Sequence, residues 1–115
     1  MTITTAPFIP LPDGEHLPHR TRIVRAAVKV DNIVYLGWRH SEIIGHIART
    51  TGKYTGQEEQ GFVDEHGYFH CRREAGRIAS RARQAPFTHN TLLSEQLWDS
   101  EGNPRKNESY DPGKR

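Results

Sequence analysis

Two arginines stand where a helix is predicted to begin. Arg72 and Arg73 follow Cys71 and open an amphipathic segment that runs to Gln84. A helix N-terminus carries about half a positive charge and several unpaired N–H groups, so cationic side chains there are unfavourable unless an anion lies beside them. The pattern therefore predicts an anion site. The alternative is that both side chains extend into water, which costs little.

A second polar cluster, Trp38-Arg39-His40, lies where a predicted strand ends and a predicted helix begins. Ligands are often bound at such junctions. Guanidinium forks match phosphate oxygens in a bidentate way, so Arg39 and Arg72 together would hold a phosphate best. Helical periodicity points His40 inward, where it is either a core residue hydrogen-bonded to the backbone or a ligand contact.

The arginines of the second helix fall into two sets. Arg72 lies near the apolar stripe, where we expect it to pair with Glu74 or with an anion. Arg73, Arg77 and Arg81 lie on the far side. That far side is either a solvated face or a surface for an acidic protein or a nucleic acid, of which nucleic acid is not favoured.

Other residues whose side chains could take part in a reaction also have a simpler structural explanation. Glu95, after Ser94, is either a general base or part of a capping turn. Cys71 is either a small residue at a strand end or a thiol activated by the neighbouring cations. The seven histidines lack the spacing of a known zinc site, and no GxSxG, Gly-Lys-Ser/Thr or paired CxxC motif occurs. The sequence thus assigns no catalytic residue, no metal ligand and no cofactor.

The first hairpin and helix position Trp38-Arg39-His40. RIVRAAVKV and IVYLG, joined by Asp31-Asn32, are rich in β-branched residues and predict two antiparallel strands. Ser41 is expected to cap a helix that runs to about Thr51 and ends at Gly52.

The second hairpin leads into the helix that carries Arg72. GFVD and YFHC flank Glu65-His66-Gly67, and Ala75, Ile78, Ala79 and Ala82 then follow at helical spacing. The order β-β-α-β-β-α predicts an α+β fold, a small antiparallel sheet with helices on one face. Ser94-Glu95 begins a short helical turn in a last apolar cluster.

Composition sets the bounds of this domain. Residues 1–21 hold four prolines and predict an extended arm, residues 22–98 a single domain, and residues 99–115 a flexible polar tail. Only 34% of residues are apolar, so the core is small, and together with the polar ends this suggests a homodimer. No apolar run could span a membrane and no signal peptide is visible, so we expect a cytoplasmic protein.

Three stretches resemble a group of small proteins encoded in bacteriophage and prophage genomes. They are AAVKVDNIVYLGWRH, QGFVDEHGYFHCRREAGRIASRARQ and LLSEQLW. The chain departs from the group's pattern at Trp38, which adds a stacking surface, at Cys71, where Asp is expected, and at Arg83, where Gly would end the helix. The resemblance implies a role for the polar positions Arg39, His40, Gln60, Gly61, Asp64, Arg72, Glu74, Gln84, Ser94 and Glu95.

The residues and the resemblance together favour a phage accessory protein that acts by binding in the host cytoplasm. We expect it to sequester a phosphate-containing small molecule, such as a nucleotide-derived immune signal. The alternatives are a protein-directed inhibitor of a host defence complex, such as an anti-CRISPR, that uses the second helix's far side, and a small His/Glu phosphodiesterase. The expected ligand-binding residues are Trp38, Arg39, His40, Gln60, Arg72, Glu74, Ser94 and Glu95.

Overall fold

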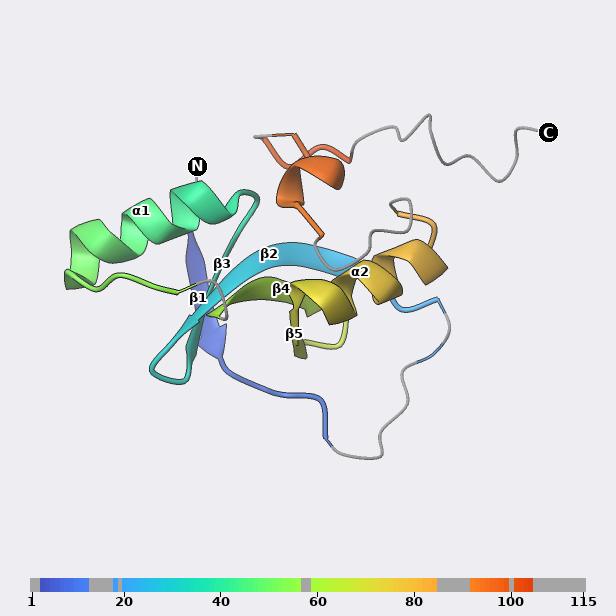
Figure 1. The fold of residues 1–115 in the computed structure, drawn as a ribbon, viewed down its shortest axis with the longest axis horizontal. Coiled ribbons are helices and arrows are strands. Elements are labelled where there is room, and N and C mark those ends of the chain that lie inside the picture. Colours follow the sequence, from blue (N-terminus) through green and yellow to red (C-terminus); the bar gives the residue numbers. More distant parts are fainter. Residues whose placement is uncertain are drawn as a thin grey trace.

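A computed structural model of the chain describes residues 3–12, 18, 20–56, 59–84, 92–99 and 101–104. In these residues five strands and two helices confirm the predicted α+β class, in the order β-β-β-α-β-β-α (Figure 1). The elements are β1 (Thr4–Pro7), β2 (Ile23–Val30), β3 (Ile33–Gly37), α1 (His40–Thr51), β4 (Gln60–Asp64), β5 (Phe69–Cys71), α2 (Arg72–Arg81) and the 3₁₀ turn η2 (Ser94–Gln96).

The sheet is antiparallel throughout, with the strand order β1-β3-β2-β4-β5. Both predicted hairpins are confirmed, and β2 lies at the centre because it pairs with β3 on one side and β4 on the other. Asp31 and Asn32 have φ angles of 52° and 65°, the conformation of a two-residue turn that matches the twist of its strands.

The N-terminal arm contributes a strand that the sequence pattern did not indicate. β1 pairs with the outer edge of β3, and the chain then continues along the sheet, where Phe8 N–H donates to Asn32 and Phe69 N–H donates to Ile9. The described residues 4–9 of the predicted arm are thus bound to the chain's own sheet. Edge pairing uses backbone groups alone, so the sequence Thr-Thr-Ala-Pro carries no alternation that would reveal it.

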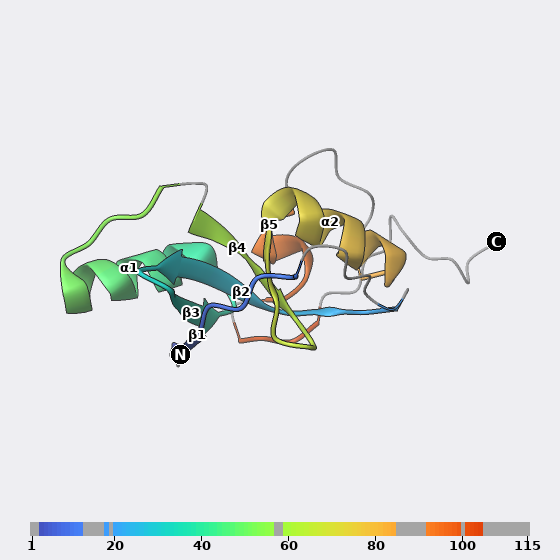
Figure 2. The same ribbon diagram turned by 90° about the horizontal axis from the view of Figure 1, so that it is seen from below.

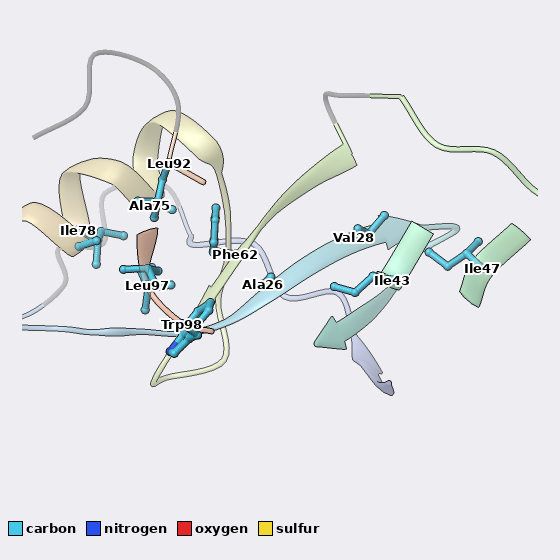
Figure 3. Close-up of a cluster of buried hydrophobic side chains, with 12 residues drawn as sticks. Ala26, Val28, Ile43, Ile47, Phe62, Ala75, Ile78, Leu92, Leu97 and Trp98 are labelled. Carbon is cyan, nitrogen blue, oxygen red and sulfur yellow. The ribbon is translucent and has the colours of Figure 1, made fainter. Parts of the chain in front are cut away.

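Both helices cover the same face of the sheet, as predicted. On that face Ala26, Val28 and Phe62 form one buried cluster with residues of α1, α2 and the segment 92–98. Figure 3 shows Ile43 and Ile47 of α1 beside Val28, and Ala75 and Ile78 of α2 at the other end of the cluster. The opposite face carries a smaller cluster of Ala27, Val34 and Val63.

The start of α1 differs from the prediction. The helix begins at His40 with Arg39 as its N-cap residue, and no side chain caps it. Ser41 therefore lies inside the first turn, so its predicted capping role is wrong. The reason is tertiary: the His40 ring is buried against Phe62 and hydrogen-bonded to Gly61, which holds residue 40 in the helical turn. Gly52 ends the helix as predicted, with φ at 75°.

The end of α2 joins the helix to the start of β2. Arg83 adopts φ of 61°, and the N–H of Gln84 donates back to Ala79, which closes a Schellman-type end. The side chain of Gln84 then accepts from Ile23 N–H over 2.7 Å and donates to the Ile23 carbonyl over 2.8 Å. Gln84 is therefore a structural residue that fixes α2 to the central strand.

The first residues of the predicted polar tail form a turn. The Asp99 carboxylate accepts from the N–H groups of Glu101 and Asn103, and Gly102 lies against the ring of Trp38. A Cβ atom at Gly102 would come within 2.3 Å of that ring, so the contact requires glycine. The rest of the predicted tail, residues 100 and 105–115, lies outside the described residues. Of the described helices, none has the length and apolarity needed to cross a membrane.

Candidate functional site

The two helices begin close to each other. Figures 1 and 2 show that α1 and α2 run in opposite directions from the middle of the molecule, with their N-terminal ends facing each other and η2 beside them. A pocket of about 250 Å³ lies there. Its lining residues come from four segments and are Arg39, His40, Ser41, Ile44, Gln60, Arg72, Leu93, Ser94 and Glu95.

Arg72 is held by two neutral acceptors. Its guanidinium donates to the Leu92 carbonyl over 2.9 Å and to the Gln60 side-chain carbonyl over 2.6 Å. Desolvation by burial lowers the pKa of Arg72, and the negative charge of Glu95 partly offsets that effect. An arginine has five N–H donors. The group is therefore fixed in place and half-buried, and it keeps donors that these two bonds do not use.

Arg39 faces the same pocket from the start of α1. Its side chain is only 14% exposed, yet within the described residues its guanidinium makes one polar contact, a 3.6 Å approach to Glu95. That distance is too long for a hydrogen bond. The Glu95 side chain is 63% exposed, so the ion pair is a weak one. Arg39 thus retains its capacity to bind an anion.

The turn η2 places the single carboxylate of the pocket. The buried Ser94 hydroxyl donates to Glu95 over 3.2 Å, and the Gln96 side chain accepts from Leu93 N–H over 2.9 Å. Gln96 therefore makes the capping contact that the sequence suggested for Glu95. The pKa of Glu95 is lowered by its own backbone N–H, and further by Ser94 and Arg39, so the carboxylate is ionised at neutral pH.

His40 is a buried, neutral histidine that also lines the pocket. Its Nε2 donates to the Gly61 carbonyl over 2.7 Å, since a carbonyl oxygen only accepts. Desolvation by burial and the positive charge of Arg72 lower the pKa of His40 to about 4. The prediction of a core histidine bonded to the backbone is confirmed. In this neutral ring Nδ1 carries a lone pair.

The backbone adds to the positive field of the pocket. Neither the N-cap residue of α1, Arg39, nor that of α2, Cys71, makes a side-chain capping bond. The first N–H groups of a helix are unpaired within it, and each N-terminus carries roughly half a positive charge. Two arginines and two helix ends therefore act at one place. Glu95 is the carboxylate among the residues that line the pocket, and the first turns of the two helices also carry Glu42 and Glu74.

The structure brings six of the eight predicted ligand-binding residues around this pocket and leaves two outside it. Trp38 packs against Trp98 at 5.2 Å between ring centroids, with the guanidinium of Arg25 at 4.1 Å from its ring. Glu74 is exposed and pairs with Arg77 at 3.3 Å instead of with Arg72. A ligand role for Trp38 and Glu74 therefore gains no support from this geometry.

The alternative partner surface lies on the outside of α2. Arg73, Arg77 and Arg81 are exposed, and Arg77 pairs with Glu74. Cys71 is an exposed free cysteine at the N-cap of α2, the position predicted for it.

Sequence reasoning missed the apolar part of the pocket. Ile44 and Leu93 line it beside the polar groups, and Leu93 is 42% exposed. Leu93 sits among leucines that predict a core, so only its place directly before the Ser94-Glu95 turn distinguishes it. The Leu92 carbonyl that Arg72 bonds is a backbone group, for which no sequence signal exists.

Two other polar groupings are already satisfied. The buried carboxylate of Asp64 accepts from His70 at 2.7 Å and from the N–H groups of His66 and Tyr68, which fixes the second hairpin. In the part of the chain that the structure describes, no three side chains of His, Cys, Asp or Glu are placed to hold a metal ion.

A larger hollow, of about 600 Å³, lies at the other end of α1. It is lined by the turn at Asp31, by Lys29 and by Lys53, Tyr54 and Glu59. Lys53 already pairs with Asp31 there, and both side chains are more than half exposed. Its size alone does not favour it, because Lys53 and Asp31 are paired with each other and well exposed. In the smaller pocket neither Arg39 nor Arg72 is hydrogen-bonded to a carboxylate within the described residues.

The family model described as "Phage T4 y16D protein" matches residues 22–98, which is more than half of the 115-residue chain and includes every described pocket residue. No curated protein and no solved structure matches the chain.

Proposed function

The chain belongs to the phage T4 y16D protein family, and we propose that this phage accessory protein acts by binding. The pocket between the N-termini of α1 and α2 would hold the phosphate group of a small molecule, such as a nucleotide-derived immune signal of the host. Holding that molecule without changing it would withdraw it from its receptor.

One observation carries this proposal. Arg39 and Arg72 line the same pocket, and within the described residues neither guanidinium is hydrogen-bonded to a carboxylate. Partly buried cations are normally paired, because desolvation of an unpaired charge is costly. A bound phosphate would supply the missing anion, and it would meet two guanidinium forks and two uncapped helix ends.

The same geometry favours binding over hydrolysis. A general acid or base works best when its pKa lies near the working pH. His40 has a pKa of about 4 and uses Nε2 on a backbone carbonyl, so it is a poor proton carrier at neutral pH. The lowered pKa of Glu95 makes that carboxylate a weak base.

The test is capture of a ligand from a nucleotide extract of bacterial cells. The purified chain is incubated with the extract, washed and heat-denatured, and the released small molecules are identified by mass spectrometry. We expect the protein to release a phosphate-containing molecule in chemically unchanged form. This molecule should be absent when the Arg39→Gln variant is used instead. Arg81→Gln, which removes an exposed arginine of α2 outside the pocket, should capture as much as the unmodified chain.

Two results would decide against the proposal. A cleaved product that accumulates with time would mean that the pocket is catalytic. Equal capture by the unmodified chain and by Arg39→Gln would mean that the ligand binds elsewhere.

The exposed position of Arg73, Arg77 and Arg81 favours a second candidate, the protein-directed inhibitor of a host defence complex. These residues recur every four positions, so they form one row on the outside of α2. Replacing all three with Glu would abolish binding to an acidic protein surface and leave ligand capture in the pocket unchanged. The Arg39→Gln variant would have the opposite pattern.

A further inference from the structure

We propose that the group held in the pocket is a terminal phosphomonoester in its doubly charged form, and not a singly charged phosphodiester. This inference rests on the proposed function and narrows its ligand class. It follows from the charge, the donors and the size of the pocket.

The charge of the lining groups matches a dianion. Arg39 and Arg72 are cationic, Glu95 is ionised, and His40 of α1 is neutral, while Gln60 of β4 carries no charge. Two cations and one carboxylate leave one net positive charge among the lining side chains. The two helix N-termini add to it, although Glu42 and Glu74 in their first turns offset part of that addition. A phosphomonoester carries about −1.5 to −2 at pH 7, whereas each phosphodiester carries −1.

The donors are also arranged for a group with three free oxygens. Arg72 is fixed by Gln60 and Leu92, so its unused N–H groups have a set direction. Arg39 approaches from α1, and the N-termini of the two helices, which no side chain caps, lie beside the two guanidinium groups. A monoester presents three non-bridging oxygens, while a diester presents two and must route its chain out of the pocket on two sides.

The volume agrees with an end group. The pocket measures about 250 Å³, below the roughly 300–1,000 Å³ of sites that enclose a drug-sized ligand. It therefore has room for a phosphate and part of the attached group. Ile44 and the exposed Leu93 give that attached group an apolar wall.

The test compares two nucleotides that share a base and differ in the ester, AMP and 3′,5′-cyclic AMP. Isothermal titration calorimetry measures both at pH 7.5 and pH 5.0 and at one ionic strength. We expect AMP to bind at least tenfold more tightly than cyclic AMP at pH 7.5. The second pKa of a phosphomonoester is about 6, so at pH 5.0 about one tenth of AMP is dianionic and its advantage should shrink to about twofold.

The protein groups that face the phosphate do not confuse this comparison. Arginine side chains stay cationic in proteins. Between pH 5.0 and 7.5 the lowered pKa of Glu95 keeps that carboxylate ionised, and His40 remains largely neutral. The change with pH therefore reports on the ligand. Arg39→Gln should weaken AMP binding at least tenfold, and the matched variant Arg81→Gln should not.

Each other outcome overturns the inference. Cyclic AMP that binds as tightly as AMP, with a loss in Arg39→Gln, would refute the monoester assignment and leave the phosphate pocket standing. No binding of either nucleotide at millimolar concentration would also refute it, and ligand capture from extract would then judge the proposed function separately. If Arg39→Gln binds AMP as tightly as the unmodified chain does, the phosphate binds outside the pocket.

Discussion

Gln60 accepts a hydrogen bond of 2.6 Å from the guanidinium of Arg72, and it does so as a neutral amide. A carboxylate at this position would neutralise the arginine, whereas the amide orients it and leaves its charge in place. The first residue of β4 thus decides how much positive charge the start of α2 presents to the pocket.

The variant Gln60→Glu tests this role with almost no change of shape. We expect the new carboxylate to pair with Arg72, so that the affinity for AMP falls at least tenfold while the thermal midpoint stays the same or rises. Calorimetry and thermal unfolding measure the two quantities on one sample. An unchanged affinity would show that the charge of Arg72 is not used in binding.

Replacing Arg39 removes a positive charge from the pocket with a smaller expected loss of stability than replacing Arg72. Arg72→Ala would leave the Leu92 carbonyl without its donor, which costs about 1–3 kcal/mol when the group is buried. Among the described polar contacts Arg39→Gln breaks one, the 3.6 Å approach to an exposed carboxylate, and Gln keeps part of the covered aliphatic stem, so the free energy of unfolding should change by less than about 1 kcal/mol. Urea unfolding checks this expectation. A far larger loss of stability would make Arg39 a structural residue.

Glu95 competes with the ligand for Arg39. Removing its charge with Glu95→Gln should therefore raise the affinity for AMP several-fold, because Arg39 no longer has an alternative partner. Glu74→Gln is the matched control, since Glu74 is also an exposed carboxylate in an arginine pair but lies outside the pocket. If Glu95→Gln instead weakens binding, Glu95 contacts the ligand directly, for example through a hydroxyl group.

The sequence predicted the elements of this domain well, because their signals are local. β-Branched runs flank Asp31-Asn32, and Gly52 ends α1 in the conformation that glycine favours. The strand Thr4–Pro7 was missed because its pairing with β3 depends on the backbone of a distant segment. The start of α1 was misplaced because burial of His40, a tertiary effect, overrides the capping preference of Ser41.

The candidate site was predictable only in part for the same reason. The arginines were found because they stand at helix starts, where their charge is unfavourable without a partner. The bonds that fix Arg72 join residues 12 and 20 positions away, so the neutral character of its partners could not be read from spacing. Trp38 looked like a ligand surface, yet Trp98 and Arg25 already cover its ring.

Arg83 is a residue whose conformation suits glycine better. It ends α2 with φ of 61°, a left-handed conformation that strains a residue with a Cβ atom. Arg83→Gly should therefore stabilise the domain by about 0.5–1 kcal/mol and raise the thermal midpoint by a few degrees. The matched variant Arg77→Gly, inside the same helix, should destabilise by about 1 kcal/mol. A loss of stability in Arg83→Gly would mean that the side chain of Arg83 makes a contribution larger than this strain.

The burial of His40 predicts that the domain loses stability in mild acid. Its pKa is about 4 in the folded chain against 6.5 for an exposed histidine, so between these values the unfolded chain binds the proton first. The contribution of neutral His40 to the free energy of unfolding is fully present above pH 6.5. It is lost as the pH drops towards 4, by on the order of 3 kcal/mol in total. His40→Gln keeps a donor for the Gly61 carbonyl and cannot titrate, so urea unfolding between pH 7 and 4.5 should show a shallower loss. Equal slopes in the unmodified chain and in His40→Gln would exclude His40 as the cause.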